Sequence, residues 1–226
     1  MDVFIAFLYA AALSACLNVF YGKVLAPFYH LKYSDKEYRK PAKSEAFLGF
    51  LICTLCLWPL CINAAAGGDI WAVPICILLL ITAMVDFGYR KIPNELVIII
   101  LIISAFLRVY GTIAYDDFSY LLSGISGGIG AVIPLIAAVL IFEKGVGTGD
   151  IKLIFAIGVY LGAPLSVHFF FITFLLAFIA AVALLTIKKA GRRSRIVMAP
   201  FMALSFVITV YFDYFLLALD FYGRLR

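Results

Sequence analysis

Two aspartates stand where long apolar segments are interrupted by a few polar residues. Asp150 follows three alternating glycines, Gly145, Gly147 and Gly149, and directly precedes an apolar segment. Asp86 ends another apolar segment, 64 positions earlier in the sequence. A carboxylate at the edge of a lipid bilayer is costly in free energy, and such residues usually have a functional role.

Two carboxylates at close range can hydrolyse a peptide bond without a metal ion or a nucleophilic side chain. One is the general base that activates water, and the other is the general acid that protonates the leaving amine. Because neighbouring carboxylates do not both ionise easily, they share a proton and titrate as a pair. Asp86 and Asp150 are therefore the candidate catalytic residues, and we expect no metal or other cofactor. The three glycines permit close approach of substrate or of a neighbouring helix beside Asp150.

Each of these polar residues also has a structural interpretation. Asp150 could be the N-cap of the helix that follows it, and Asp86 could be a solvated helix flank. Asn94, which follows Pro93, is interpreted as the cap of the next helix. An alternative function is an ion-coupled transporter that uses the same two aspartates to carry protons or cations. Transporter sites tend to lie near the bilayer midplane, whereas these aspartates both fall at the rim of predicted helices.

The composition identifies the class of protein that must position the two aspartates. Of the 226 residues, 65% are hydrophobic and only 14% are charged, and the mean hydropathy is +1.11. Soluble domains contain about 25% charged residues. We therefore predict an all-α, polytopic integral membrane protein with a bundle of about eight transmembrane segments. The expected segments are 3–21, 46–66, 70–85, 96–110, 120–142, 151–161, 165–187 and 197–217.

Three of these segments are shorter than a full membrane span. A helix needs about 20 apolar residues to cross a hydrocarbon core about 30 Å thick, and the third, fourth and sixth segments fall short of that length. All three adjoin Asp86 or Asp150. Short helices can border a water-filled cavity, so the pattern favours a wet site at one face of the membrane.

The chain is predicted to form one membrane-embedded domain over residues 1–226. Residues 22–45 are predicted to be a short basic cytoplasmic loop without a separate soluble domain. The first apolar segment is expected to be a retained helix, because Asp2 stands where a signal peptide carries basic residues. The expected surroundings are the lipid bilayer, and no nucleic-acid partner is expected.

The basic residues predict the orientation in the membrane. If the first helix starts outside, 15 of the 18 Lys and Arg residues lie on the inner side, and only Arg108, Arg224 and Arg226 lie outside. Basic residues favour the cytoplasmic side of membrane proteins. We therefore expect a multi-pass protein of the inner or plasma membrane, with Asp86 and Asp150 both facing the cytoplasm.

These motifs resemble those of the type IV prepilin peptidases, which are membrane aspartic proteases with a Gly-x-Gly-Asp motif. The segment 147–153 matches that motif closely, and Asp86 followed by Ile92-Pro93-Asn94 matches the motif of the family's first aspartate. The segments 12–19 and 199–204 resemble the family's first helix and its Pro-Phe segment more distantly. The resemblance covers nearly the whole chain.

The resemblance implies an activity, a substrate and further site residues. Family members remove a short basic leader from pilin-like precursors at the cytoplasmic face. Lys152 recurs in the family motif, and it could lower the pKa of Asp150 or anchor the helix to lipid headgroups. The inner loops are strongly basic, so a basic leader requires an acidic contact to offset the repulsion. Glu95 and Glu143 are the candidates for this contact.

Larger family members carry a cytoplasmic domain with paired Cys-x-x-Cys motifs that bind zinc, and this domain is linked to N-methylation of the product. Residues 22–45 contain no cysteine, so the resemblance implies a compact member without the methyltransferase. Cys53 and Cys56 form a Cys-x-x-Cys motif, but all five cysteines lie in apolar segments. We interpret them as small core residues and expect no metal site.

The pairs Gly124/Gly128 and Gly158/Gly162 are interpreted as helix-packing positions.

Overall fold

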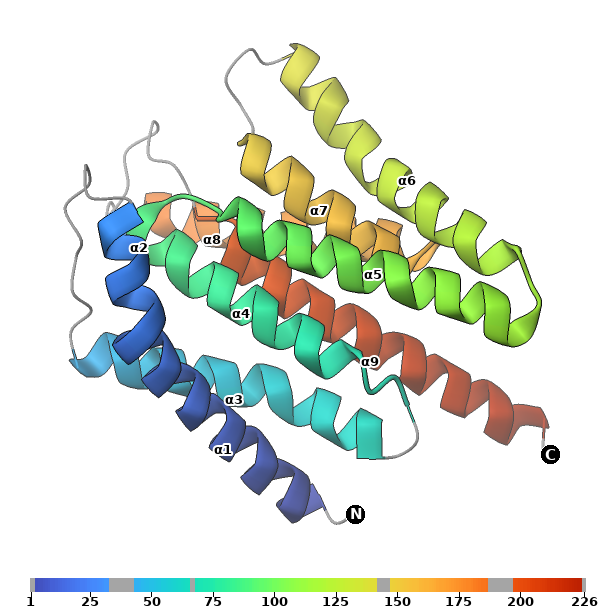
Figure 1. Ribbon diagram of the computed structural model, residues 1–226, viewed down its shortest axis with the longest axis horizontal. Helices are drawn as coiled ribbons and strands as arrows, with labels where there is room; N and C mark the ends of the chain where they lie inside the picture. Colours follow the sequence, from blue (N-terminus) through green and yellow to red (C-terminus); the bar gives the residue numbers. More distant parts are fainter. Residues whose placement is uncertain (1–2, 33–42, 66–67, 142–146, 187–196, 225–226) are drawn as a thin grey trace. The chain divides into compact units, whose positions relative to one another are not determined.

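The computed structural model of the protein describes residues 3–32, 43–65, 68–141, 147–186 and 197–224. Helices account for the regular structure in these ranges, and none of the described residues forms a strand (Figure 1). Backbone N–H and C=O groups in lipid must be hydrogen-bonded within the segment, so long apolar segments form helices. The prediction of an all-α fold is confirmed.

The predicted apolar segments all coincide with helices. The elements are α1 (Val3–Phe20), the π-helical turn η1 (Tyr21–Leu25), α2 (Ala26–Lys32), α3 (Lys43–Ala65), α4 (Ala72–Tyr89), α5 (Asn94–Tyr115), α6 (Ser119–Ile141), α7 (Thr148–Leu161), α8 (Leu165–Thr186) and α9 (Ala199–Arg224). The first helix differs most from its predicted bounds, because α1, η1 and α2 follow one another without interruption. Residues 22–32 are therefore helical, whereas the sequence predicted a loop there.

Five helical stretches among the described residues are long and apolar enough to cross a membrane. They are Phe4–His30, Ala72–Tyr89, Asn94–Tyr115, Ser119–Ala137 and Leu165–Ala183. Two shorter apolar stretches, Leu51–Ala64 and Ala199–Phe212, belong to α3 and α9. The protein is thus a multi-pass membrane protein, as predicted. Helix α7 has only 14 residues, so the prediction of a short sixth segment is confirmed. The prediction that the third and fourth segments fall short is wrong, because α4 and α5 have 18 and 22 residues and are long enough to cross a membrane.

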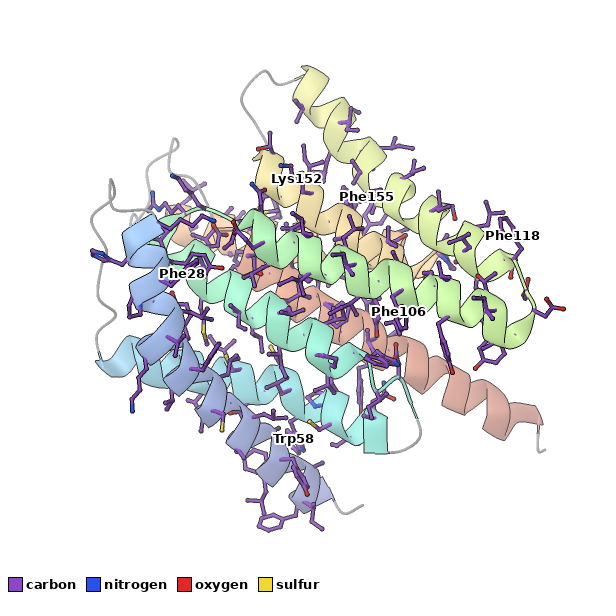
Figure 2. All side chains as sticks on the ribbon, viewed as in Figure 1. Phe28, Trp58, Phe106, Phe118, Lys152 and Phe155 are labelled. Carbon is purple, nitrogen blue, oxygen red and sulfur yellow. The ribbon has the colours of Figure 1, made fainter. Side chains whose placement is uncertain are left out.

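The helices group into two units. The first contains Met1–Arg90 and Phe206–Arg226, and the second contains Lys91–Ser205. In the first unit α1 packs along α3, and the rings of Phe7 and Trp58 meet edge to face with centroids 5.4 Å apart. Figure 2 labels Trp58 on α3.

A tyrosine cluster in the first unit explains why the first helix extends to Lys32. Tyr29 is buried against Val85 and Tyr89 of α4, and Tyr21 and Leu25 pack at the edge of this cluster. Apolar contact with α4 therefore stabilises helical structure beyond the end of the predicted apolar segment. A helix boundary set by packing in this way is not visible in local hydropathy.

The second unit is built around α7, which packs against both α5 and α6. Glycines allow the backbones of α6 and α7 to approach closely. A methyl group at Gly127 would lie 2.5 Å from the carbonyl carbon of Gly162, and one at Gly158 would lie 2.8 Å from the carbonyl oxygen of Gly127. The packing role predicted for Gly124, Gly128, Gly158 and Gly162 is confirmed, and Gly127 joins this set.

A polar contact joins α8 to the start of α9 within the same unit. The hydroxyl groups of Thr173 and Ser205 lie 2.5 Å apart and are buried. Because each hydroxyl has one proton, one of them donates to the other, and the second donates to a backbone carbonyl of its own helix, that of Phe169 or Met202. This pair satisfies both hydroxyls in an apolar setting, where an unpaired hydroxyl would be costly.

The cysteines fit the predicted core role in most cases. Cys53, Cys56 and Cys76 are buried, and Cys61 is half-buried. Cys16 is exposed on α1, so the interpretation as a core residue is wrong for this cysteine. Hydropathy alone does not reveal which residues of an apolar helix are exposed.

Candidate active site

Asp86 lies in the last turn of α4, inside the helix. The sequence predicted that the helix ends at Val85, but α4 continues to Tyr89. The Asp86 side chain is only 6% exposed, whereas a solvated flanking residue would be largely exposed. The interpretation of Asp86 as a solvated helix flank is therefore wrong.

Two tyrosine hydroxyls tie this end of α4 to the first helix. Tyr21 donates a hydrogen bond to the carbonyl of Met84 at 3.1 Å. Tyr89 donates to the carbonyl of Ala26 at 3.2 Å. These bonds bracket Asp86 along α4 and hold the helical turn that carries it.

Helix α4 ends abruptly after Asp86. Arg90 adopts the left-handed conformation with φ of 52°, and its N–H donates to the carbonyl of Asp86 at 2.8 Å. Pro93, in an extended conformation, then precedes the first residue of α5, Asn94. Asn94 is thus the first helical residue, and the prediction that it caps α5 is wrong.

Asp150 lies in the first turn of α7, and Gly147 occupies the N-cap position. The interpretation of Asp150 as the N-cap is therefore wrong. Its carboxylate folds back toward the helix start, since a methyl group at Gly147 would lie 2.8 Å from Asp150 Oδ2. An acidic side chain in the first turn is stabilised by the helix dipole. Glycine at 147 thus leaves space for the Asp150 carboxylate.

The Gly-x-Gly-Asp segment contacts the Ile-Pro-Asn segment within the second unit. A methyl group at Gly149 would lie 3.1 Å from Ile92 Cβ, so the residue before Asp150 packs directly on the Ile-Pro-Asn segment. Lys152 Nζ donates a hydrogen bond to Asn94 Oδ1 at 3.3 Å. Figure 2 shows Lys152 at the start of α7, which is also where α5 begins. The first turns of α5 and α7 are therefore joined side by side.

The structure places the other predicted site residues as follows. Glu95 is exposed in the first turn of α5, and Lys152 is exposed on α7. Gly145 and Glu143 lie outside the described residues. The sequence did not predict that Ile92 and Asn94 contact Gly149 and Lys152. The Ile-Pro-Asn motif indicated that this segment matters, but not which residues it contacts.

Comparison with known proteins shows a similarity over about half of the chain. Residues 73–182 match the model of the type IV leader peptidase family. The chain is also 36% identical over 117 residues to the prepilin leader peptidase/N-methyltransferase of Bacillus subtilis (strain 168). This match covers 51% of the chain and 45% of that relative, so the chain matches about half of the relative's length. No solved structure matches the chain.

Over residues 73–182, just under half of its length, the chain is therefore similar to the type IV leader peptidase family. The matched range contains both aspartates, the Ile-Pro-Asn segment and the glycines beside Asp150. It also contains most of the second unit, including α5, α6 and α7. The resemblance inferred from the two aspartate motifs is confirmed over this range, and the segments 12–19 and 199–204 lie outside it.

Proposed function

We propose that the protein is an aspartic endopeptidase that removes the short basic leader from type IV prepilin-like precursors. In this proposal Asp86 and Asp150 share a proton, activate water and protonate the leaving amine at the cytoplasmic face of the membrane. The observation that carries the proposal is the packing of Gly149 and Lys152 on Ile92 and Asn94. It joins the motif of the second aspartate to the segment that directly follows the first.

Catalysis by this pair requires that both carboxylates reach the same face of the membrane, and the connectivity of the chain supports this. Three residues separate Arg90 from Asn94, and four Cα–Cα steps extend over at most about 14 Å. That is less than half of a hydrocarbon core about 30 Å thick. We therefore expect Asp86, in the last turn of α4, to face the same side of the membrane as the start of α5, and the Lys152–Asn94 bond supports the same side for the start of α7.

The direct test uses the purified chain in proteoliposomes and a synthetic precursor with a basic leader and an apolar mature helix. Cleavage is followed by mass spectrometry, which also detects any N-methylation of the new N-terminus. The proposal predicts a shortened product without methylation. Absence of cleavage, together with proton or cation flux that depends on Asp86 and Asp150, would instead support the ion-coupled transporter.

The contact between Gly149 and Ile92 gives a test of the motif packing. We expect Gly149→Val to lower kcat by about 10- to 100-fold, because a misplacement of about 1 Å near a catalytic group has effects of this size. Ile92→Gly removes all the side-chain atoms that the new valine would meet, including Cβ, so the double variant should recover part of kcat. If Ile92→Gly gives no recovery, the loss does not come from this contact.

Glu95 and Glu143 are proposed contacts for the basic leader. Reversing the charge in Glu95→Lys or Glu143→Lys should raise KM for the precursor several-fold with little change in kcat, because a leader contact contributes to binding. The matched control is a precursor whose leader lysines are replaced by glutamine, for which the two variants should behave like the unmodified chain. Unchanged KM in both variants would remove these residues from the leader-binding site.

A further inference from the structure

The backbone carbonyls at the C-terminal end of α7 need hydrogen-bond donors from outside the helix. With 14 residues at about 1.5 Å each, α7 is about 21 Å long and does not span a core about 30 Å thick. If its Asp150 end is at the cytoplasmic face, its other end lies within the hydrocarbon. The last four carbonyls of a helix have no partner inside the helix, and unpaired carbonyls are costly in lipid.

Arg108 of α5 supplies hydrogen bonds to this end of α7. Its Nε donates to the carbonyl of Val159 at 3.0 Å, and its Nη2 donates to the carbonyl of Tyr160. The carbonyl of Gly158 is bonded by the N–H of Gly162 at 2.9 Å. A guanidinium group also carries a positive charge to the negative end of the helix dipole. Its fixed fork of donors suits two adjacent carbonyls better than an ammonium group does.

The surrounding residues are shaped to admit the Arg108 side chain. A methyl group at Gly124 would lie 2.9 Å from Arg108 Cγ. One at Gly162, where φ is +71°, would lie 2.6 Å from Arg108 Nη2 and 2.6 Å from Ser123 Oγ. Ser123 also links α6 to the same turn, because its carbonyl accepts from the N–H of Ala163 at 3.1 Å. Any other residue at 124 or 162 would displace the arginine.

Helix α5 thus holds α7 at both of its ends. At the first end Asn94 bonds Lys152 and Ile92 packs on Gly149, and at the other end Arg108 bonds the terminal carbonyls. Asp150 lies ten residues before Tyr160, which corresponds to about 15 Å along the helix. We propose that Arg108 is a positioning residue that sets the depth of α7 and, through it, of Asp150. Its catalytic consequence rests on the proposed peptidase function.

The test compares Arg108→Gln and Arg108→Lys with a matched control, Thr173→Val, which removes a buried hydrogen bond from the same unit. The first measurement is amide hydrogen exchange in the purified chain, and it requires no peptidase activity. Arg108→Gln should accelerate amide exchange by at least about tenfold at Gly162, which follows the capped end of α7. Exchange at Asp150 and Ile151 should accelerate by the same factor, since a helix released at one end loses its alignment at the other. Faster exchange confined to residues 158–163 would overturn the proposal and leave Arg108 as a local cap.

The second measurement is precursor cleavage. Arg108→Gln should lower kcat by about 10- to 100-fold with KM within about twofold, because a small displacement of Asp150 affects the chemical step more than substrate binding. Arg108→Lys keeps one donor and the charge, so it should lose less. Equal losses in Thr173→Val would overturn the proposal, since they would reflect general destabilisation.

The two measurements separate the inference from the proposed function. If the unmodified chain does not cleave the precursor, the peptidase proposal fails, and the exchange pattern still decides whether Arg108 aligns both ends of α7. If Arg108→Gln does not reach the membrane, the same pattern is measured in Arg108→Lys. A wild-type exchange pattern in that lysine variant would then overturn the proposal.

Discussion

Replacing Asp150 with asparagine is expected to abolish precursor cleavage, with a loss in kcat of about a thousandfold or more. Asparagine has nearly the same shape as aspartate but cannot take up or release a proton, and general acid–base catalysis contributes about 10²–10⁴-fold per group. Asp86→Asn should have an effect of the same size. Because the two carboxylates act as one unit, the double variant should be little worse than either single variant.

We expect that these losses will not come from unfolding, because asparagine keeps the size of aspartate and one of its acceptor oxygens. Gly147 occupies the N-cap position of α7, and Asp150 lies in the first turn. Loss of the negative charge there should weaken the interaction with the helix dipole by about 0.3–1 kcal/mol. Each variant should therefore reach the membrane in normal amounts, which an immunoblot of membrane fractions measures.

Asp116→Asn is the matched control for the two aspartate variants. Asp116 is exposed and adopts the left-handed conformation with φ of 50°, which asparagine also tolerates well. This variant should cleave the precursor at the normal rate. Substantial cleavage by either Asp86→Asn or Asp150→Asn would exclude a mechanism in which the two aspartates share a proton.

A single methyl group at Gly127 is expected to destabilise the second unit. It would lie 2.5 Å from the carbonyl carbon and 2.7 Å from the Cα of Gly162, and 2.6 Å from the carbonyl oxygen of Gly158. These are backbone atoms, which cannot rotate away as a flexible side chain can. Gly127→Ala should therefore lower the free energy of unfolding by about 1–3 kcal/mol, the usual range for an overpacked core. Cleavage should fall as well, because α6 supports the helix that carries Asp150.

Gly130→Ala on the same helix is the control, because this substitution should not lower the free energy of unfolding. A methyl group there meets no atom within 4 Å, so Gly130→Ala keeps the packing and gains helix propensity. Its stability should be unchanged or higher by up to about 1 kcal/mol. Unfolding in mixed micelles measures both variants. Equal stability of Gly127→Ala and the unmodified chain would mean that α6 and α7 are not in backbone contact.

The helices could be predicted well because the bilayer limits what an apolar segment can become. Segments of this length and hydropathy are helical in lipid, since no other local structure satisfies their backbone. The same reasoning failed at residues 22–32, where Tyr29 extends the first helix by packing on Val85 and Tyr89. It also placed Cys16 in the core, although this cysteine is exposed.

The site was predictable in its residue types but not in its contacts. Two aspartates beside short apolar segments, with glycines next to one of them, are uncommon enough to indicate chemistry. Their structural interpretations as an N-cap and a solvated flank were both wrong, because the helix ends lie elsewhere than local sequence suggests. Gly147 caps α7, and α4 continues past Asp86 to Tyr89.

By itself, the sequence determined the class of protein, the positions of its helices and the two acids on which the proposed chemistry depends, since these follow from apolar length and residue type. Only the tertiary structure decided that Lys152 bonds Asn94, that Gly149 packs on Ile92 and that Arg108 caps α7. Each of these contacts joins residues at least 50 positions apart, and it forms because neighbouring helices bring their backbones close at small residues. No local pattern in the chain encodes which helices become neighbours.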